Sequence, residues 1–127
     1  MYINFSCKKS APSADDKNQK EKFKAIINYQ GLVNEQEFIA LWRKRHPMPE
    51  LQAMMYCLSF QYTLKECILQ GEIVRFSLLG NIYPTFSSDI VDDPKKVNEK
   101  IIKDLGIYIK PNKFLESEMR DYLRKEK

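Results

Sequence analysis

The segment from Gly71 to Glu116 constrains the fold more than any other part of this chain of 127 residues. It begins with an alternating apolar run that reaches a single glycine, Gly80, and continues as a second such run to Phe86. A polar stretch at residues 87–105 follows, and the chain returns through LGIYIKP into a helix-like segment with a charged end, EMRDYLRKEK. A lone glycine between alternating runs is typical of a turn between strands. The segment therefore predicts a β-hairpin, an excursion, a short return strand and a final helix.

Two helices are expected before this hairpin. Asn34 can cap the first, because its side-chain oxygen can accept from a backbone N–H of the first turn, and Glu37 can complete a capping box. That helix ends at His46, before a Pro-Met-Pro break. The second helix covers residues 49–70 and is followed by Gly71, which is well placed for a left-handed C-cap.

The second helix is apolar on two sides, which predicts a dimer. At about 100° per residue, one apolar stripe consists of Ala53, Cys57, Phe60, Leu64, Cys67 and Ile68. The other consists of Leu51, Met54, Leu58, Tyr62 and Leu69. A helix with two apolar sides must be covered on both, one by the chain's own sheet and one by a second copy. The expected homodimer interface comprises Leu51, Met54, Leu58, Tyr62, Leu79 and Ile82.

Two strands are expected near the N-terminus. The run INFSC alternates apolar and polar residues, the period-two pattern of a half-buried strand. Residues 23–31 are β-prone and can pair with it across a polar segment. We expect a mobile loop at residues 10–21 and a strand extension over residues 1–32 as a whole.

Composition places the chain among soluble globular proteins of one domain. Hydrophobic residues make up 43% and charged residues 30%, and the net charge is +4. These proportions are too apolar for a disordered chain, and the charge mildly favours a polyanionic partner. No run approaches the roughly 20 apolar residues of a membrane span, and no signal-peptide pattern opens the chain. Three cysteines without a CxxC pair indicate reduced thiols, so we expect a cytoplasmic protein.

Patterns for catalysis or metal binding are missing from the sequence. His46 is the only histidine and ends a helix among basic residues. There is no CxxC, HExxH, acidic calcium loop or glycine-rich phosphate loop. We therefore expect no enzyme activity, no catalytic residue, no metal, no cofactor and no small-molecule substrate. The tyrosines are scattered and are expected to be core and interface aromatics.

The order of the expected elements resembles a known family. From the first helix onward, two helices, a strand–glycine–strand hairpin, an arm, a return strand and a last helix are similar to the bacterial HU and integration-host-factor family of nucleoid DNA-binding proteins. Within it the chain resembles most the HU-like HIG branch, which carries an N-terminal extension. The runs GEIVRFSLLGNIYPTF and IKPNKFL carry the resemblance, which covers residues 33–123. It implies an α+β, HU/IHF-like fold for residues 1–127, with two intertwined chains and an arm at residues 87–105.

The resemblance also implies a DNA-contacting surface beneath the arms. Lys110 stands where the family usually has an arginine after the return strand, and Lys113 matches a family lysine at the start of the last helix. Arg75, on the first hairpin strand, can face the same surface. Basic residues on such a surface attract phosphates without reading the base sequence.

The arm departs from the family pattern. The RNPxTG-type tip is replaced by DDPKK, so the one candidate for a proline wedge between bases is Pro94. The other candidate DNA contacts in the arm are Lys95, Lys96, Lys100 and Lys103. Acids outnumber these lysines, and a net-negative arm is repelled by phosphates. The run VNEKIIKDL has helical spacing, which favours a folded or shortened arm.

Two functions remain open. The first is a homodimer that binds duplex DNA with little sequence preference and has an architectural role in the nucleoid; the overall positive charge and IKPNKFL favour it. The second is a protein-interaction module of the same fold with weak or no DNA binding, which the acidic arm favours. A helix-turn-helix is excluded, because the second helix is too long and too apolar to lie exposed in a major groove.

Overall fold

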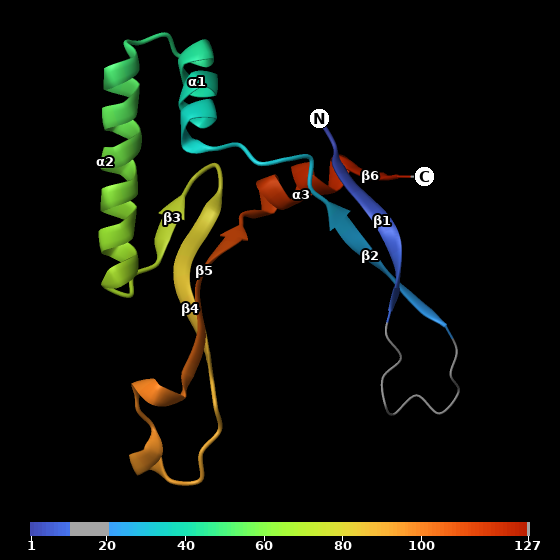
Figure 1. The fold of residues 1–127 in the computed structure, drawn as a ribbon, viewed down its shortest axis with the longest axis vertical. Coiled ribbons are helices and arrows are strands. Elements are labelled where there is room, and N and C mark those ends of the chain that lie inside the picture. The colour runs from blue at the N-terminus through green and yellow to red at the C-terminus, as the bar shows by residue number, and fades with distance from the viewer. Residues whose placement is uncertain (11–20, 127) are drawn as a thin grey trace. The chain divides into compact units, whose positions relative to one another are not determined.

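The computed structural model describes residues 1–10 and 21–126. The chain divides into two compact units. We call Val33–Leu115 the central unit, and Met1–Leu32 together with Glu116–Lys127 the terminal unit. The described residues form an α+β structure, as the sequence predicts, and they contain two three-stranded sheets (Figure 1). The mobile loop expected at residues 10–21 lies almost wholly outside the described residues, and the single domain over residues 1–127 stays a prediction.

The central unit contains two helices, one sheet and the start of a third helix. Its elements are α1 (Glu35–Arg45), α2 (Glu50–Leu69), β3 (Val74–Phe76), β4 (Gly80–Ser88), the 3-10 turns η1 (Pro94–Lys96) and η2 (Glu99–Ile101), β5 (Ile102–Pro111) and the first residues of α3 (Lys113–Asp121). Strand order in the sheet is β3-β4-β5, and both pairings are antiparallel.

The caps predicted at the start of α1 and at the end of α2 are confirmed. The Asn34 side chain accepts a hydrogen bond of 2.8 Å from the Glu37 backbone N–H, which caps α1. Gly71 has φ +75 after α2, and its N–H donates to the Ile68 carbonyl oxygen at 2.9 Å. The next N–H, of Glu72, donates to Cys67 at 3.0 Å, which completes a Schellman ending. This ending fixes where α2 stops, shortly before β3 begins.

One apolar side of α2 is covered within the chain at its beginning. Ala53 and Cys57 are buried against Ile39 of α1. Further along α2, the ring of Phe60 lies 5.5 Å from the ring of Phe76 on β3. This contact joins the helix pair to the sheet, but Phe60 is still 50% exposed, so the chain itself covers only part of the first predicted stripe.

The second apolar stripe of α2 is uncovered in the single chain. Its five side chains are between 42% (Met54) and 76% (Leu69) exposed. Leu79, at the β3–β4 turn, is 44% exposed, but Ile82 on β4 is only 4% exposed. Ile82, which was expected at the dimer interface, therefore belongs to the core of its own chain.

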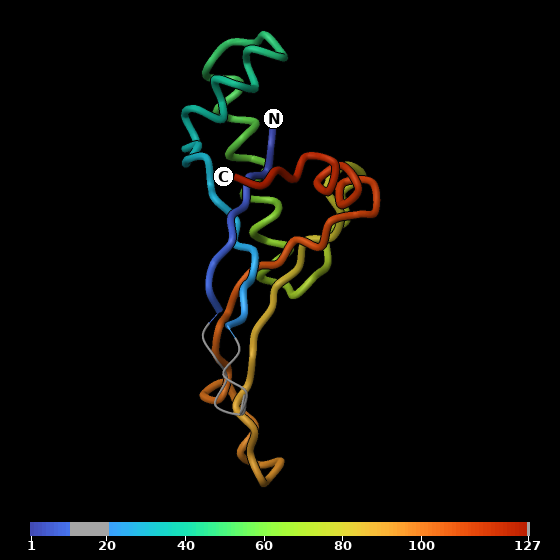
Figure 2. The backbone as a smooth tube through the Cα atoms, turned by 90° about the vertical axis from the view of Figure 1, so that its right-hand side faces the viewer, coloured from blue at the N-terminus to red at the C-terminus, as the bar shows by residue number. Residues whose placement is uncertain are grey.

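β4 and β5 form a long ribbon that extends beyond the end of α2 in both views (Figure 1, Figure 2). A bulge between Thr85 and Ser87 places Asp104 at φ +53, and the Ser87 hydroxyl donates to its carboxylate at 2.6 Å. The return strand begins at Ile102 and is therefore longer than the short strand that was expected within LGIYIKP. The predicted helical spacing of VNEKIIKDL is realised only as the single 3-10 turn η2.

The terminal unit joins the two ends of the chain in a second sheet. Its strands are β1 (Ile3–Ser10), β2 (Lys22–Asn28) and β6 (Leu123–Lys125), in the order β2-β1-β6. The pairing of β1 with β2 is antiparallel, as expected, and β6 runs parallel to β1. The last residues were expected to be the charged end of the final helix, but α3 ends at Asp121 and residues Leu123–Lys125 form a strand. Backbone bonds from Ile3 to Tyr122 and from Glu126 to Phe5, both 2.8 Å, hold β6 in place.

Candidate functional site

Gly80 creates the close approach on which the candidate site depends. Its φ is +123, a conformation that residues with a side chain rarely adopt. A Cβ at this position would lie 2.6 Å from the Asn112 backbone nitrogen and closer still to the Lys110 carbonyl oxygen. Only glycine therefore lets the start of β4 lie against the end of β5 and the beginning of α3.

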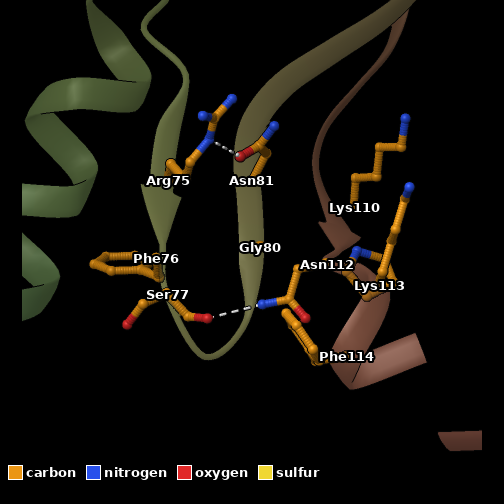
Figure 3. Close-up of a pocket in the computed structure, with 10 residues that line it drawn as sticks. Arg75, Phe76, Ser77, Gly80, Asn81, Lys110, Asn112, Lys113 and Phe114 are labelled. Carbon is orange, nitrogen blue, oxygen red and sulfur yellow. Dashed lines mark hydrogen bonds between the residues drawn. The ribbon is translucent and has the colours of Figure 1, made fainter. Parts of the chain in front are cut away.

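Asn112 fixes the start of α3 to the hairpin. Its Oδ1 atom accepts from the Leu115 backbone N–H at 2.7 Å, an N-cap, and its Nδ2 donates to the Ser77 carbonyl oxygen at 2.8 Å (Figure 3). Its own backbone N–H donates to Leu79 at 3.1 Å. These three hydrogen bonds give a structural role to the asparagine of the IKPNKFL segment. They also set the position of the next residue, Lys113.

Three strands bring Arg75, Asn81 and Lys110 into one row. Asn81 is opposite Arg75 in the β3–β4 pairing and opposite Lys110 in the β4–β5 pairing. Directly opposed residues point to the same face of a sheet. The Arg75 Nε atom donates to Asn81 Oδ1 at 3.1 Å. We call these three residues together with Lys113 the cation row.

The cation row lines an open pocket of about 440 Å³. In Figure 3, Lys110 and Lys113 extend in the same direction. Within residues 1–10 and 21–126, no ion pair involves Arg75, Lys110 or Lys113. The structure thus brings the three predicted cations together, with their charges not compensated by described carboxylates.

The same face of the sheet continues with residues that the sequence analysis did not select. Tyr83 and Tyr108 are opposite each other on β4 and β5, with ring centroids 5.6 Å apart and an edge-on angle of 70°. Tyr83 lies two residues after Asn81 on β4, and Tyr108 lies two residues before Lys110 on β5. Counting alternate positions from Asn81 would have found this pair, because it needs only the hairpin register set by Gly80.

The predicted arm residues are arranged differently. Lys96 pairs with Asp92 and Lys103 with Asp89, each with a nitrogen–oxygen distance of 2.8 Å. Pro94 and Lys95 lie in η1 and Lys100 in η2, at the far end of the ribbon. Lys103 is opposite Ser87, whereas Lys110 is opposite Asn81, so the arm lysines are separate from the cation row.

No group of three or more His, Cys, Asp or Glu side chains in the described parts of the chain could hold a metal ion. No described helix is long and apolar enough to cross a membrane. The backbone N–H of His46 closes the end of α1 by donating to the Trp42 carbonyl oxygen at 2.8 Å.

Comparison with known proteins supports the family and the fold. The family model HU-HIG, described as an HU domain fused to a wHTH, Ig or glycine-rich motif, matches residues 1–127. The fold is similar to a crystal structure of a protein from Bacteroides vulgatus ATCC 8482, provisionally described as a bacterial DNA-binding protein. That match has a TM-score of 0.63 and 11% identity, and covers 98% of this chain and 47% of the other. No curated protein matches the chain.

Proposed function

The chain belongs to the HU-HIG family, and from this premise we propose that it binds duplex DNA through phosphate contacts from the cation row. One observation carries the proposal. The strand register puts Arg75 and Lys110 on either side of Asn81, and no described carboxylate pairs with either cation. DNA binding is also what the family suggests.

Each member of the cation row has a role that follows from its chemistry. The Arg75 guanidinium has several donors and is oriented by its bond to Asn81, so it can hold a phosphate in a fixed geometry. Lys110 and Lys113 add mobile point charges beside it. These groups contact phosphates and not the edges of the bases. The binding is therefore independent of the DNA sequence, and its affinity falls as the salt concentration rises. We therefore propose an architectural role in the nucleoid.

The functional form is a homodimer in this proposal. The second stripe of α2, with Leu51, Met54, Leu58 and Tyr62, is exposed along the helix. A contiguous apolar surface of this kind is typical of a protein interface. Covering it with a second copy would remove it from water and would provide two cation rows for one DNA duplex.

The experiment that tests the DNA site is fluorescence anisotropy of a labelled non-specific duplex at several salt concentrations. The variant Lys110→Glu/Lys113→Glu should weaken binding by about 100-fold at low salt and reduce the slope of log K against log salt by about two. The matched variant Lys95→Glu/Lys100→Glu changes the charge equally within the arm and should have a much smaller effect.

Three outcomes would contradict parts of this proposal. Equal losses of affinity in both variants would mean that the cation row contributes no more to DNA binding than the arm does. Unchanged affinity after Lys110→Glu/Lys113→Glu would exclude those lysines from the site. A wild-type protein that binds no duplex even at low salt would favour the alternative function, a protein-interaction module of the same fold.

The dimer is tested separately by analytical ultracentrifugation. Leu58→Asp places a charge on the exposed stripe of α2 and should convert the dimer to a monomer or prevent folding. Ser59→Asp introduces the same charge one residue later, on the narrow polar side predicted for this helix, and should leave the dimer intact. A Leu58→Asp protein that stays folded and dimeric would place the interface elsewhere.

A further inference from the structure

The sheet of the terminal unit has one face that is rich in basic residues. Opposed residues share a face, and alternate residues along a strand return to it. Lys8 on β1 is opposite Lys24 on β2, and Ser10 is opposite Lys22. At the other end of β1, Asn4 is opposite Arg124 of β6. We call Lys8, Lys22, Lys24 and Arg124 the basic face.

The opposite face of this sheet has a different character. It carries the apolar side chains of β1 and their partners, with Phe5 opposite Ile27 and Cys7 opposite Ala25. Lys9 lies on this second face and forms an ion pair of 2.8 Å with Glu21. The sheet therefore has two different faces, and Lys125, opposite Phe5, also lies on the apolar one.

The pairing of Lys8 with Lys24 is unfavourable within the sheet itself. Like charges directly opposite each other on two strands repel, and both side chains are exposed. Among residues 1–10 and 21–126, no carboxylate forms an ion pair with either lysine. A local arrangement that works against stability is expected where a site has a function. An anionic partner would turn this repulsion into an attraction.

The other polar groups of this face suit the same partner. The Arg124 guanidinium carbon lies 4.8 Å from the centre of the Tyr2 ring, which holds this cation at the surface. Glu126 accepts a 2.7 Å hydrogen bond from the Asn28 amide at the end of β2, so this acid already has a donor within the sheet. The Ser6 hydroxyl donates to Asn28 Oδ1 at 3.3 Å, whereas Ser10, opposite Lys22, carries a hydroxyl of the kind that binds phosphate oxygens.

We infer that the basic face is a second surface for the DNA phosphate backbone, distinct from the cation row of the central unit. The identity of the ligand rests on the proposed function, whereas the charge arrangement does not. From Asn4 to Ser10 the face is about 20 Å long, and each DNA strand carries a phosphate about every 3.4 Å along the axis. A cationic surface of this length can contact several phosphates.

The test uses the full chain and the labelled duplex, titrated at several salt concentrations. Lys8→Glu/Lys24→Glu reverses the charge at the centre of the basic face but keeps the like-charge pairing, so the folded sheet is disturbed little. The control, Lys9→Glu/Lys125→Glu, makes the same change in charge on the opposite face of the same sheet. Circular dichroism checks that both variants are folded.

The first variant should weaken binding about tenfold at low salt and reduce the salt slope by about two, while the control stays close to the wild type. Equal effects of the two variants would overturn the inference, because only net charge would then matter. The neutral variant Lys8→Gln/Lys24→Gln should reproduce part of the loss, and an unchanged affinity there would also overturn it.

The two DNA surfaces can fail independently. If Lys110→Glu/Lys113→Glu has no effect while Lys8→Glu/Lys24→Glu weakens binding, the proposed cation row is wrong and the basic face stands. The opposite pattern leaves the proposed function intact and removes the basic face. A wild-type protein that does not bind the duplex removes both.

Discussion

The chain contains two antiparallel β-ribbons with opposite electrostatic character. In the β4–β5 arm, Lys96 and Lys103 pair with Asp92 and Asp89. In the β1–β2 hairpin, Lys8 and Lys24 are opposite each other, with no described carboxylate as partner. Lysines on the same kind of ribbon are thus paired with carboxylates in one place and have no described carboxylate partner in the other.

This difference teaches that the ribbon shape alone does not decide where a phosphate is attracted. The field at a lysine depends on the carboxylates beside it, so a paired lysine contributes little to the attraction of a polyanion. The ribbons also differ in how they are held. The arm continues a sheet that contacts α2 through Phe60 and Phe76, whereas β6 adds a third strand to the β1–β2 hairpin.

The largest expected effect comes from the base of the arm. Gly80→Val should destabilise the central unit by about 3 kcal/mol or more, because a side chain is strained at this φ and collides with the backbone of Lys110 and Asn112. Urea unfolding measures the change. In the control Gly106→Ala, the new Cβ would be 3.6 Å from the Thr85 hydroxyl, an ordinary contact, and stability should change by less than about 1 kcal/mol. Similar results for both would show that the arm does not depend on this turn.

The second prediction concerns how the N-terminal hairpin is held. Removing residues 123–127 deletes β6, and a two-stranded hairpin is marginal in water. Hydrogen exchange of the β1 amides should then accelerate by about tenfold to 100-fold. The amides of Tyr83 and Tyr108 in the same protein are the internal control and should keep their rates. Unchanged protection of β1 would mean that β6 does not stabilise the hairpin.

Local sequence rules predicted the parts of the fold that depend on neighbouring residues. Asn34 and Gly71 were identified as caps, because capping depends on groups a few residues apart. Gly80 was identified as a turn, and the register that it sets brings Arg75 and Lys110 to one face. The convergence of the cation row could therefore be expected from the sequence, together with the family resemblance.

Contacts between distant residues could not be predicted in this way. The pairing of β6 with β1 joins opposite ends of the chain, and the three residues of β6 carry no strand pattern of their own. Lys8 is opposite Lys24 because of the register in which β1 pairs with β2, and these strands are separated in the sequence by a polar segment. The ion pairs of the arm were also missed, because charge counting does not say which lysine meets which acid.

The third prediction tests whether the carboxylates of the arm prevent its lysines from binding DNA. Asp89→Asn/Asp92→Asn removes the partners of Lys103 and Lys96, and should strengthen duplex binding by about threefold to tenfold and steepen its salt dependence. The control Glu118→Gln/Asp121→Asn makes the same change in charge near the end of α3. If both variants bind equally well, the gain comes from net charge and the ion pairs are not its cause.

The smallest effect is expected from the lysines of those ion pairs. Both pairs are largely exposed, and exposed ion pairs contribute roughly 0–1 kcal/mol. Lys96→Gln/Lys103→Gln should therefore change the free energy of unfolding by less than about 0.5 kcal/mol per residue and leave duplex affinity nearly unchanged. The matched change Lys8→Gln/Lys24→Gln should also preserve stability, or raise it slightly by removing the like-charge pair, but should weaken DNA binding. Because both variants lose two lysines from a ribbon, a difference in affinity between them isolates the effect of the neighbouring carboxylates. Equal affinities would mean that the two ribbons are equivalent toward DNA, and that the contrast in their ion pairs has no functional consequence.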